Sequence, residues 1–330
     1  MAELIFFINK VIIAGSVIGS IYALGAIGVT LVFAILRFAH FAHGDMMTAG
    51  AFFSLILLAA AQALGVQAGL PTGFIVMPLA MVLTAAFAVG IDRVFYQPLR
   101  EKNVKPVVLL MASIGVALMM QGLIRLFAGT GSRNFFADER KELFNIQVFG
   151  LRRGITFTEP QVLLILFTVI AVIALHVFLT RSRLGKAMRA MSDNSDLARV
   201  SGIDTRTVVW VTWIIAGALA GAAGTLLAMD VFLKPDLSFN ILLPIFAAAI
   251  VGGVGRPYGA IAGGFVVGFA ETLAVFNWAV LLRPFRDVLP FDIPASIAFV
   301  PTEYKIVVPF FLLVAILIWR PTGIFNGRVL

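Results

Sequence analysis

The sequence contains no cysteine, and only 13% of its 330 residues are charged. The absence of cysteine excludes disulfides, thiolate metal ligands and cysteine nucleophiles. The low charge is not typical of soluble globular domains, in which about 25% of residues are charged. The longest hydrophilic stretch, residues 129–159, is too short to enclose a hydrophobic core of its own. The sequence therefore offers no candidate for a separate soluble domain.

Long apolar runs make up most of the chain. Hydrophobic residues reach 61%, against roughly 45–50% in soluble domains. We predict an all-α integral membrane protein, a polytopic helical bundle of about 8–10 transmembrane segments in one domain over residues 1–330, because a span needs roughly 20 apolar residues. No basic stretch precedes the first run, so we expect a first span and not a cleaved signal peptide. The predicted spans cover residues 11–36, 46–66, 72–91, 106–128, 160–180, 207–229, 241–253, 258–276 and 306–319.

Lys and Arg are distributed unequally between the connections of these spans. The set that is denser in Lys and Arg comprises residues 37–45, 92–105, 181–206, 254–257 and 320–330. Because cytoplasmic loops carry an excess of Lys and Arg, we place this set, with the C-terminus, in the cytoplasm. The formal net charge of +8 follows from basic residues at the ends of apolar runs, so we expect no nucleic-acid partner.

The connection of residues 181–206 has a helical apolar pattern over residues 185–200, which Gly202 would end. Charge pairs at helical spacing, such as Arg189 with Asp193, would support this helix. A short amphipathic helix between two spans would suit a cytoplasmic docking partner. An ordinary positively charged inner loop would have the same composition, so both interpretations are open.

Three segments, one in each third of the chain, resemble one family. They are Phe41-Ala42-His43-Gly44-Asp45, then Gly185-Lys186-Ala187-Met188-Arg189-Ala190 followed by Asn194, Ala198 and Gly202, and Gly252-Gly253-Val254-Gly255 followed by Gly259, Gly263 and Gly268. Together they resemble the branched-chain amino acid permeases of ATP-binding-cassette importers. His40 and Pro244 depart from the family pattern, in which Asn and Lys are common at these positions, and both departures bear on substrate choice.

The resemblance implies an importer permease fold and a set of partners in a bacterial inner (plasma) membrane. The partners are a second homologous permease subunit, ATP-binding-cassette subunits and a periplasmic substrate-binding protein. ATP and Mg would bind to the ATP-binding subunits, and this chain would bind no cofactor or metal. Coupling to the ATP-binding subunit is implied for Gly185, Lys186, Arg189, Ala190, Asp193, Ala198 and Gly202.

The sequence has no G-x-x-x-x-G-K-[ST] phosphate loop, because Gly185-Lys186 follows Thr180 and not a glycine at the required spacing. ATP hydrolysis is therefore expected on another polypeptide, and we find no catalytic set of residues in this chain.

Glycines recur at every fourth residue in several predicted spans. This spacing places small residues on one helix face, so that helices pack closely in a membrane. Such pairs are Gly15 with Gly19 and Gly217 with Gly221. The residues assigned to helix packing in the late glycine-rich segment are Gly252, Gly253, Gly255, Gly259, Gly263 and Gly268.

Polar residues inside spans are candidates for function, because their burial in hydrocarbon is costly. His40, His43, Gly44 and Asp45 lie at an irregular junction between the first two spans, and we interpret them as a translocation pathway or gate. A solvated interfacial cluster is the alternative. Two histidines alone do not complete a metal site. Glu271 is expected to cap or to pair with Arg283 or Arg286.

Three classes of function are open to such a chain. A self-sufficient secondary transporter or channel would need charges deep in its spans or a filter, and a membrane enzyme would need catalytic residues. The sequence favours a permease subunit for aliphatic amino acids, driven by ATP hydrolysis on another subunit. Related permeases are believed to carry urea, short amides or other amino acids, so the substrate stays open.

Overall fold

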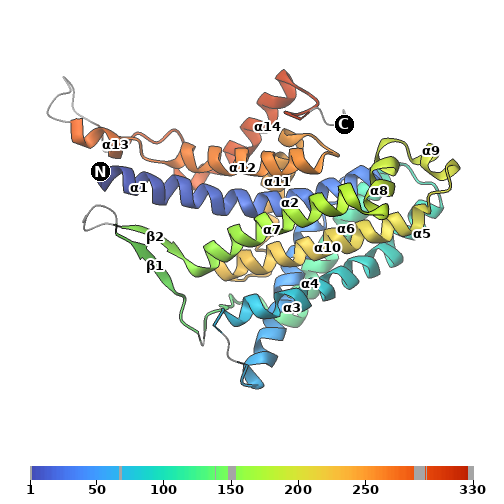
Figure 1. The fold of residues 1–330 in the computed structure, drawn as a ribbon, viewed down its shortest axis with the longest axis horizontal. Coiled ribbons are helices and arrows are strands. Elements are labelled where there is room, and N and C mark those ends of the chain that lie inside the picture. The colour runs from blue at the N-terminus through green and yellow to red at the C-terminus, as the bar shows by residue number, and fades with distance from the viewer. Residues whose placement is uncertain are drawn as a thin grey trace.

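A computed structural model describes residues 2–66, 69–137, 139–147, 154–285, 294 and 296–325. The described residues form a bundle of helices that run mostly along the long axis of the molecule (Figure 1). One end of this axis carries the N-terminus, a two-stranded sheet and α13 (Ala279–Leu282). The other end carries α5 (Gln97–Glu101), α8 (Arg183–Asp193) and α9 (Ser195–Val200).

Seven helices of the described chain are long and apolar enough to cross a membrane. They are Glu3–Leu36, His43–Ala63 (α3), Thr72–Glu101, Pro106–Ala128 (α6), Glu159–Arg181 (α7), Thr205–Asp230 (α10) and Pro257–Val275 (α12). Two shorter apolar helices, α11 (Phe239–Gly252) and α14 (Val307–Trp319), complete the set of predicted runs. The prediction of an all-α polytopic membrane protein is therefore confirmed.

Two of the long helices contain a π-helical turn. The first helix consists of α1 (Ala2–Phe7), the π turn η1 (Ile8–Ile13) and α2 (Ala14–Leu36), and it begins well before the predicted residue 11. The rings of Phe6 and Phe7 pack on Phe276, which extends this helix beyond the apolar run alone. The third consists of α4 (Thr72–Ile91), the π turn η2 (Asp92–Tyr96) and α5.

The bundle is centred on α2, most of which is buried. A Cβ atom on Gly264 of α12 would lie 2.5 Å from the backbone nitrogen of Ala23, and one on Gly268 would lie 2.6 Å from that of Gly19. On α10, Cβ atoms on Gly217 and Gly221 would lie 2.7 Å from the side chain of Ala88 and 2.6 Å from that of Thr84, both on α4. Only glycine permits such approaches, so backbone-to-backbone packing holds the membrane helices together.

Members of the two predicted sets of connections lie at opposite ends of the described bundle, but residues 37–45 and 230–240 meet inside it, where a Cβ atom on Gly44 would lie 3.0 Å from the carbonyl oxygen of Ser238. At one end, Arg37 donates from Nη2 to the carbonyl oxygen of Ser192 at 2.7 Å, which joins the α2–α3 connection to α8. At the other end, Lys141 donates to the carbonyl oxygen of Asp230 at 2.9 Å. The alternation of the spans agrees with this arrangement, and the assignment of the first end to the cytoplasm stays a prediction.

The long hydrophilic stretch contains a small sheet. Strand β1 (Leu143–Ile146) pairs antiparallel with β2 (Ile155–Thr158), with Leu143 opposite Thr158. Asn9 of η1 donates from its side-chain amide to the carbonyl oxygen of Gly154 at 3.2 Å, which fixes the sheet against the first helix. The short 3₁₀ turns η3 (Arg283–Phe285) and η4 (Thr302–Tyr304) belong to the last connection at this end.

Candidate functional site

The connection at 181–206 forms two helices, not the one predicted over residues 185–200. Asn194 has φ −151° and ψ 107°, an extended conformation that ends α8. Its side-chain oxygen accepts hydrogen bonds from the backbone N–H groups of Asp196 and Leu197, each at 3.0 Å, and so begins α9. An asparagine in this N-cap role satisfies amides that a continuous helix would bond internally. The helices α8 and α9 therefore form a corner at this end of the bundle.

One face of this corner packs on the bundle and the other is open. Met188, Met191 and Ala198 are buried, whereas the predicted coupling residues Lys186 and Arg189 are exposed. The remaining predicted coupling residues divide in the same way, with Gly185 buried, Ala190 half-buried, and Asp193 and Gly202 exposed. Val200 is 86% exposed, although it lies among charged residues at this end. The open face combines basic and apolar side chains.

Two predicted coupling glycines are required by the backbone. A Cβ atom on Gly185 would lie 2.2 Å from the carbonyl oxygen of Phe178, so only glycine lets α8 turn back on α7. Gly202 has φ +81°, a left-handed conformation that ends α9 as the sequence predicts. These glycines fix the path of the corner and leave its exposed face to other residues.

The junction between α2 and α3 forms a packed polar cluster inside the bundle. His40, His43 and Asp45 are each 0% exposed. This burial contradicts the interpretation of a solvated interfacial cluster. Among the described residues, no group of three or more possible ligands is arranged to hold a metal ion.

His40 is held by aromatic residues from two other helices. Its Nε2 atom lies 3.1 Å from the hydroxyl oxygen of Tyr96, and its ring centroid lies 4.9 Å from that of Trp213. Tyr96 and Trp213 stack on each other with centroids 5.4 Å apart. Neither aromatic residue was predicted for this site, because Tyr96 lies in the connection of residues 92–105 and Trp213 in a run that resembles any apolar span.

The start of α3 meets the start of α11 inside the described bundle. A Cβ atom on Gly44 would lie 3.0 Å from the carbonyl oxygen of Ser238. The hydroxyl of Thr48, one turn later, accepts a hydrogen bond from the backbone nitrogen of Ser238 at 3.3 Å. The structure thus brings the predicted residues His40, His43, Gly44 and Asp45 together at a point where two helices begin.

The late glycine-rich segment has two roles, of which the sequence predicted one. A Cβ atom on Gly252 would lie 1.9 Å from the carbonyl oxygen of Gly259, and one on Gly263 would lie 2.0 Å from that of Ala248. These contacts pack α11 against α12. Gly253 and Gly255 do not belong to helix packing as predicted. They have φ +115° and φ +81° and form the turn before Pro257 begins α12.

Glu271 of α12 pairs with other residues than those expected. The hydroxyl of Tyr22 donates to its Oε2 atom at 2.7 Å, and Lys305 Nζ lies 3.4 Å from its Oε1 atom. The expected pair with Arg283 is therefore replaced by one with Lys305. The other expected partner, Arg286, lies outside the described residues.

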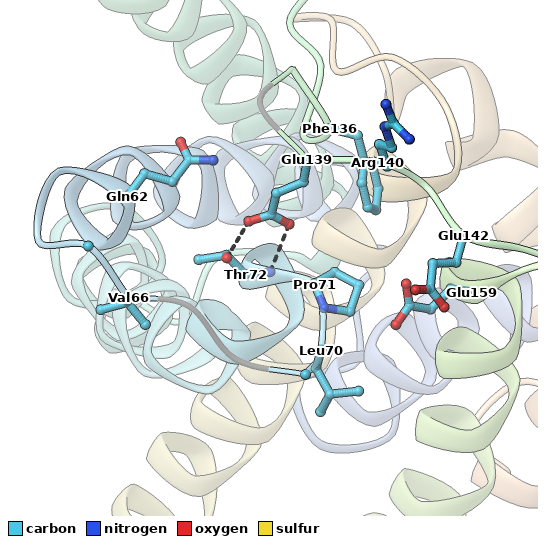
Figure 2. Close-up of a pocket in the computed structure, with 12 residues that line it drawn as sticks. Gln62, Val66, Leu70, Pro71, Thr72, Phe136, Glu139, Arg140, Glu142 and Glu159 are labelled. Carbon is cyan, nitrogen blue, oxygen red and sulfur yellow. Dashed lines mark hydrogen bonds between the residues drawn. The ribbon is translucent and has the colours of Figure 1, made fainter.

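An open cavity of about 560 Å³ lies at the end that carries the sheet (Figure 2). Glu139 accepts hydrogen bonds from the backbone nitrogen and the hydroxyl of Thr72, which begins α4. Figure 2 shows Glu142 and Glu159 close together on the opposite wall. The carboxylate of Glu139 thereby ties the 129–159 stretch to the N-terminus of α4, where the helix dipole favours a negative charge.

Comparison with known proteins identifies related chains. Residues 11–317 match the family described as branched-chain amino acid transport system, permease component. The chain is 33% identical to the high-affinity branched-chain amino acid transport system permease protein LivH of Escherichia coli, over 98% of this chain and 97% of the relative. It is 29% identical to the permease protein BraD of Pseudomonas aeruginosa, with the same coverage. It is 30% identical to the probable permease protein LivH of Methanocaldococcus jannaschii, over 82% of each chain.

Proposed function

The chain belongs to the family of branched-chain amino acid transport permeases, and we propose that it is the membrane-spanning permease subunit of an ATP-driven importer for these amino acids. The observation that carries the proposal is the likeness to LivH of E. coli over nearly the whole of both chains. The membrane bundle supports it, because its helices are long and apolar enough to span a bilayer. The proposed location is a bacterial inner membrane.

Transport by this subunit requires ATP hydrolysis on partner subunits, which would hold the ATP and Mg. The proposal includes a second homologous permease, ATP-binding-cassette subunits and a periplasmic substrate-binding protein as partners. The α8–α9 corner is the proposed contact with the ATP-binding subunit. Its exposed face presents Lys186, Arg189 and the apolar Val200, a combination that suits a protein surface with acidic and apolar groups.

Movement of the α8–α9 corner would be transmitted by residue contacts to the buried cluster at the α2–α3 junction. Arg37 bonds to Ser192 of α8 and begins the segment that leads to His40. His40 in turn contacts Tyr96 and Trp213. A shift of α8 would therefore act on the α2–α3 junction, and we propose that His40, His43, Gly44 and Asp45 form a gate there.

The test is uptake of radiolabelled leucine by bacterial cells that lack this gene, with and without the gene restored. We expect uptake to fall on deletion, to return on complementation and to collapse when ATP is depleted. A catalytically inactive ATP-binding subunit, expressed with the intact permease, serves as the control for ATP dependence. If leucine uptake is the same in all strains, the cargo assignment fails. Urea, short amides and other amino acids are then the next labelled substrates to test.

A further inference from the structure

Four arginines line one open cavity at the end of the bundle that carries α5, α8 and α9 (Figure 1). The cavity has a volume of about 470 Å³. Its arginines come from four separate segments: Arg37 from the α2–α3 connection, Arg100 from α5, Arg199 from α9 and Arg206 from α10. Glu101 is the one acidic side chain among the described lining residues. The four cations and one anion give the lining an excess of positive charge.

Much of this positive charge is not neutralised by the described chain. Arg100 forms an ion pair with Asp92 at 2.5 Å. Arg199 and Arg206 are exposed and make no ion pair within 4.0 Å among the described residues. The carboxylate of Asp204, close to Arg206 in sequence, is engaged at the start of α10, where it accepts hydrogen bonds from backbone N–H groups. The cavity therefore presents guanidinium groups that an anion can bind.

The backbone of the cavity wall is strained at two positions. Arg37 has φ +62° and Asn103 has φ +52°, and in the described chain these are the two non-glycine residues with positive φ. Both line the cavity. Glycine is the usual residue where a helix ends in this conformation, but at position 37 it would remove a guanidinium. Strain of this kind clusters at ligand-binding positions, so it supports a binding role for the cavity.

The cavity lies where the exposed surface of the bundle changes from charged to apolar. Arg206, Trp210 and Ile214 follow one another on one face of α10, because they are four residues apart. Arg206 is exposed, Trp210 is half-buried and Ile214 is 47% exposed. Next to this face, the guanidinium of Arg93 lies 5.1 Å from the centroid of the Trp210 ring, and Val94 is 65% exposed. A tryptophan between cations and aliphatic side chains is typical of the level of lipid headgroups.

We propose that this cavity binds the phosphate headgroup of an anionic phospholipid from the leaflet that faces the α8–α9 corner. Guanidinium groups bind phosphate oxygens in a two-pronged geometry, and basic pockets between membrane helices at the cytoplasmic side suit such headgroups. The acyl chains lie along the apolar surface beyond Trp210. This surface favours a lipid over an acidic patch of the ATP-binding subunit, because a soluble subunit does not reach hydrocarbon.

The arrangement gives the lipid a structural role. Because the four arginines belong to four segments, one headgroup ties the α8–α9 corner to α5, to α10 and to the connection that leads to the buried cluster. Lys186 and Arg189, on the exposed face of the corner, do not line the cavity and stay available to a protein partner. The inference does not depend on the cargo of the importer.

Trp210 lines the cavity, so its fluorescence reports lipid binding. The assembled importer complex, in neutral phosphatidylcholine micelles, is titrated with phosphatidylglycerol or phosphatidylcholine whose acyl chains are brominated and quench nearby tryptophans. A Trp210→Phe complex gives the background from all other tryptophans. The melting temperature with the unbrominated lipids is a second measure, because a ligand that binds the folded state raises it.

We expect phosphatidylglycerol to quench Trp210 at about a tenfold lower concentration than phosphatidylcholine, since each basic side chain near an anionic surface adds about fivefold in affinity. The double variant Arg199→Gln, Arg206→Gln should reduce this preference to about twofold or less. The matched control is Arg181→Gln, Arg183→Gln, which removes two exposed charges at the same end but outside the cavity. It should keep the preference of the wild-type complex.

Four results would overturn the inference. Equal quenching by the two lipids in the wild-type complex would show that the cavity does not select an anionic headgroup. Equal loss of the preference in both double variants would show a general effect of surface charge. A preference found in the isolated permease and absent from the assembled complex would assign the cavity to the ATP-binding subunit. Displacement of the brominated lipid by an equal concentration of glycerol 1-phosphate would assign it to a soluble phosphate ester.

Discussion

Replacement of Gly224 by alanine tests how tightly α10 holds α3. A Cβ atom at this position would lie 1.8 Å from the carbonyl oxygen of Met47 and 2.6 Å from its carbonyl carbon. Both are backbone atoms, so no side-chain rotation relieves the overlap. To reach the 3.4 Å at which ordinary contact begins, the separation must grow by about 1.6 Å, the difference of the two distances.

Overpacking of this kind typically destabilises a protein by about 1–3 kcal/mol. A loss of 1 kcal/mol lowers the melting temperature of a domain of 150–250 residues by about 2–4 °C. We therefore expect Gly224→Ala to lower the melting temperature of the purified complex by several degrees and to reduce leucine uptake, because Met47 follows Asp45 on α3. Intrinsic tryptophan fluorescence during heating provides the measurement.

The matched control is Gly122→Ala on α6, where an added Cβ atom meets no atom within 4 Å. This variant should melt at or above the temperature of the wild-type complex, because alanine is a better helix former than glycine. If Gly224→Ala and Gly122→Ala melt alike, α3 and α10 are not in the close contact described.

The remaining predictions concern the α8–α9 corner, the α2–α12 contact and the start of α10. Ala190→Pro should break α8, at a cost of about 3 kcal/mol or more, and abolish uptake while the protein stays in the membrane. Ser195→Pro should be tolerated, because it occupies the first position of α9. Leucine uptake and membrane immunoblots of both variants measure these effects. Tyr22→Phe removes the hydrogen bond to Glu271 and should destabilise the complex by about 1.5–3 kcal/mol, the range for bonds to charged groups, as measured by thermal melting. The side chain and backbone of Thr207 hold the pKa of Asp204 below its ordinary value of 3.8, so the stabilisation by this carboxylate is present above that pH and lost as pH falls through the lowered pKa. Asp204→Ala should therefore lower the melting temperature at pH 7, and the difference from wild type should shrink toward pH 3.

The spans were predictable because their signal lies in local composition. Each apolar run became a helix, since unbonded backbone groups cannot be accommodated in hydrocarbon. Helix ends were less accurate, because tertiary contacts decide them. The rings of Phe6 and Phe7 pack on Phe276, and no local pattern reveals that contact.

Two predictions relied on a regular residue spacing, and in both places a local signal in the sequence indicated a different structure. The four-residue repeat placed Gly255 on the packing face with Gly259 and Gly263, but Pro257 marks the first turn of α12 and leaves Gly255 outside it. In the connection of residues 181–206, Asn194 followed by Ser195 and Asp196 is a typical N-cap sequence. The apolar spacing suggested a continuous helix there, and the capping asparagine decided otherwise.

The candidate site was only partly predictable, because its members come together from distant helices. His40, His43 and Asp45 were found from the cost of burying polar groups in a membrane. Their partners Tyr96 and Trp213 belong to other spans and have no distinguishing pattern. A cavity of about 440 Å³ between α3, α6 and α4 likewise depends on how these helices pack, which no sequence periodicity specifies.

The π-helical turn η2 fixes the rotation of everything that follows it in its helix. A π turn contains one residue more than the α-helical turn it replaces, so η2 rotates α5 by about 100° relative to a regular continuation of α4. In this helix, Tyr96 contacts His40, and Arg100 forms an ion pair with Asp92 at 2.5 Å. Loss of a single residue here, such as the exposed Val94, would convert the π turn to an α-helical turn and keep Arg100 on the helix face that it shares with Asp92. The chain should therefore tolerate the loss of one residue at this position better than the gain of one, which would rotate α5 further by about 100°.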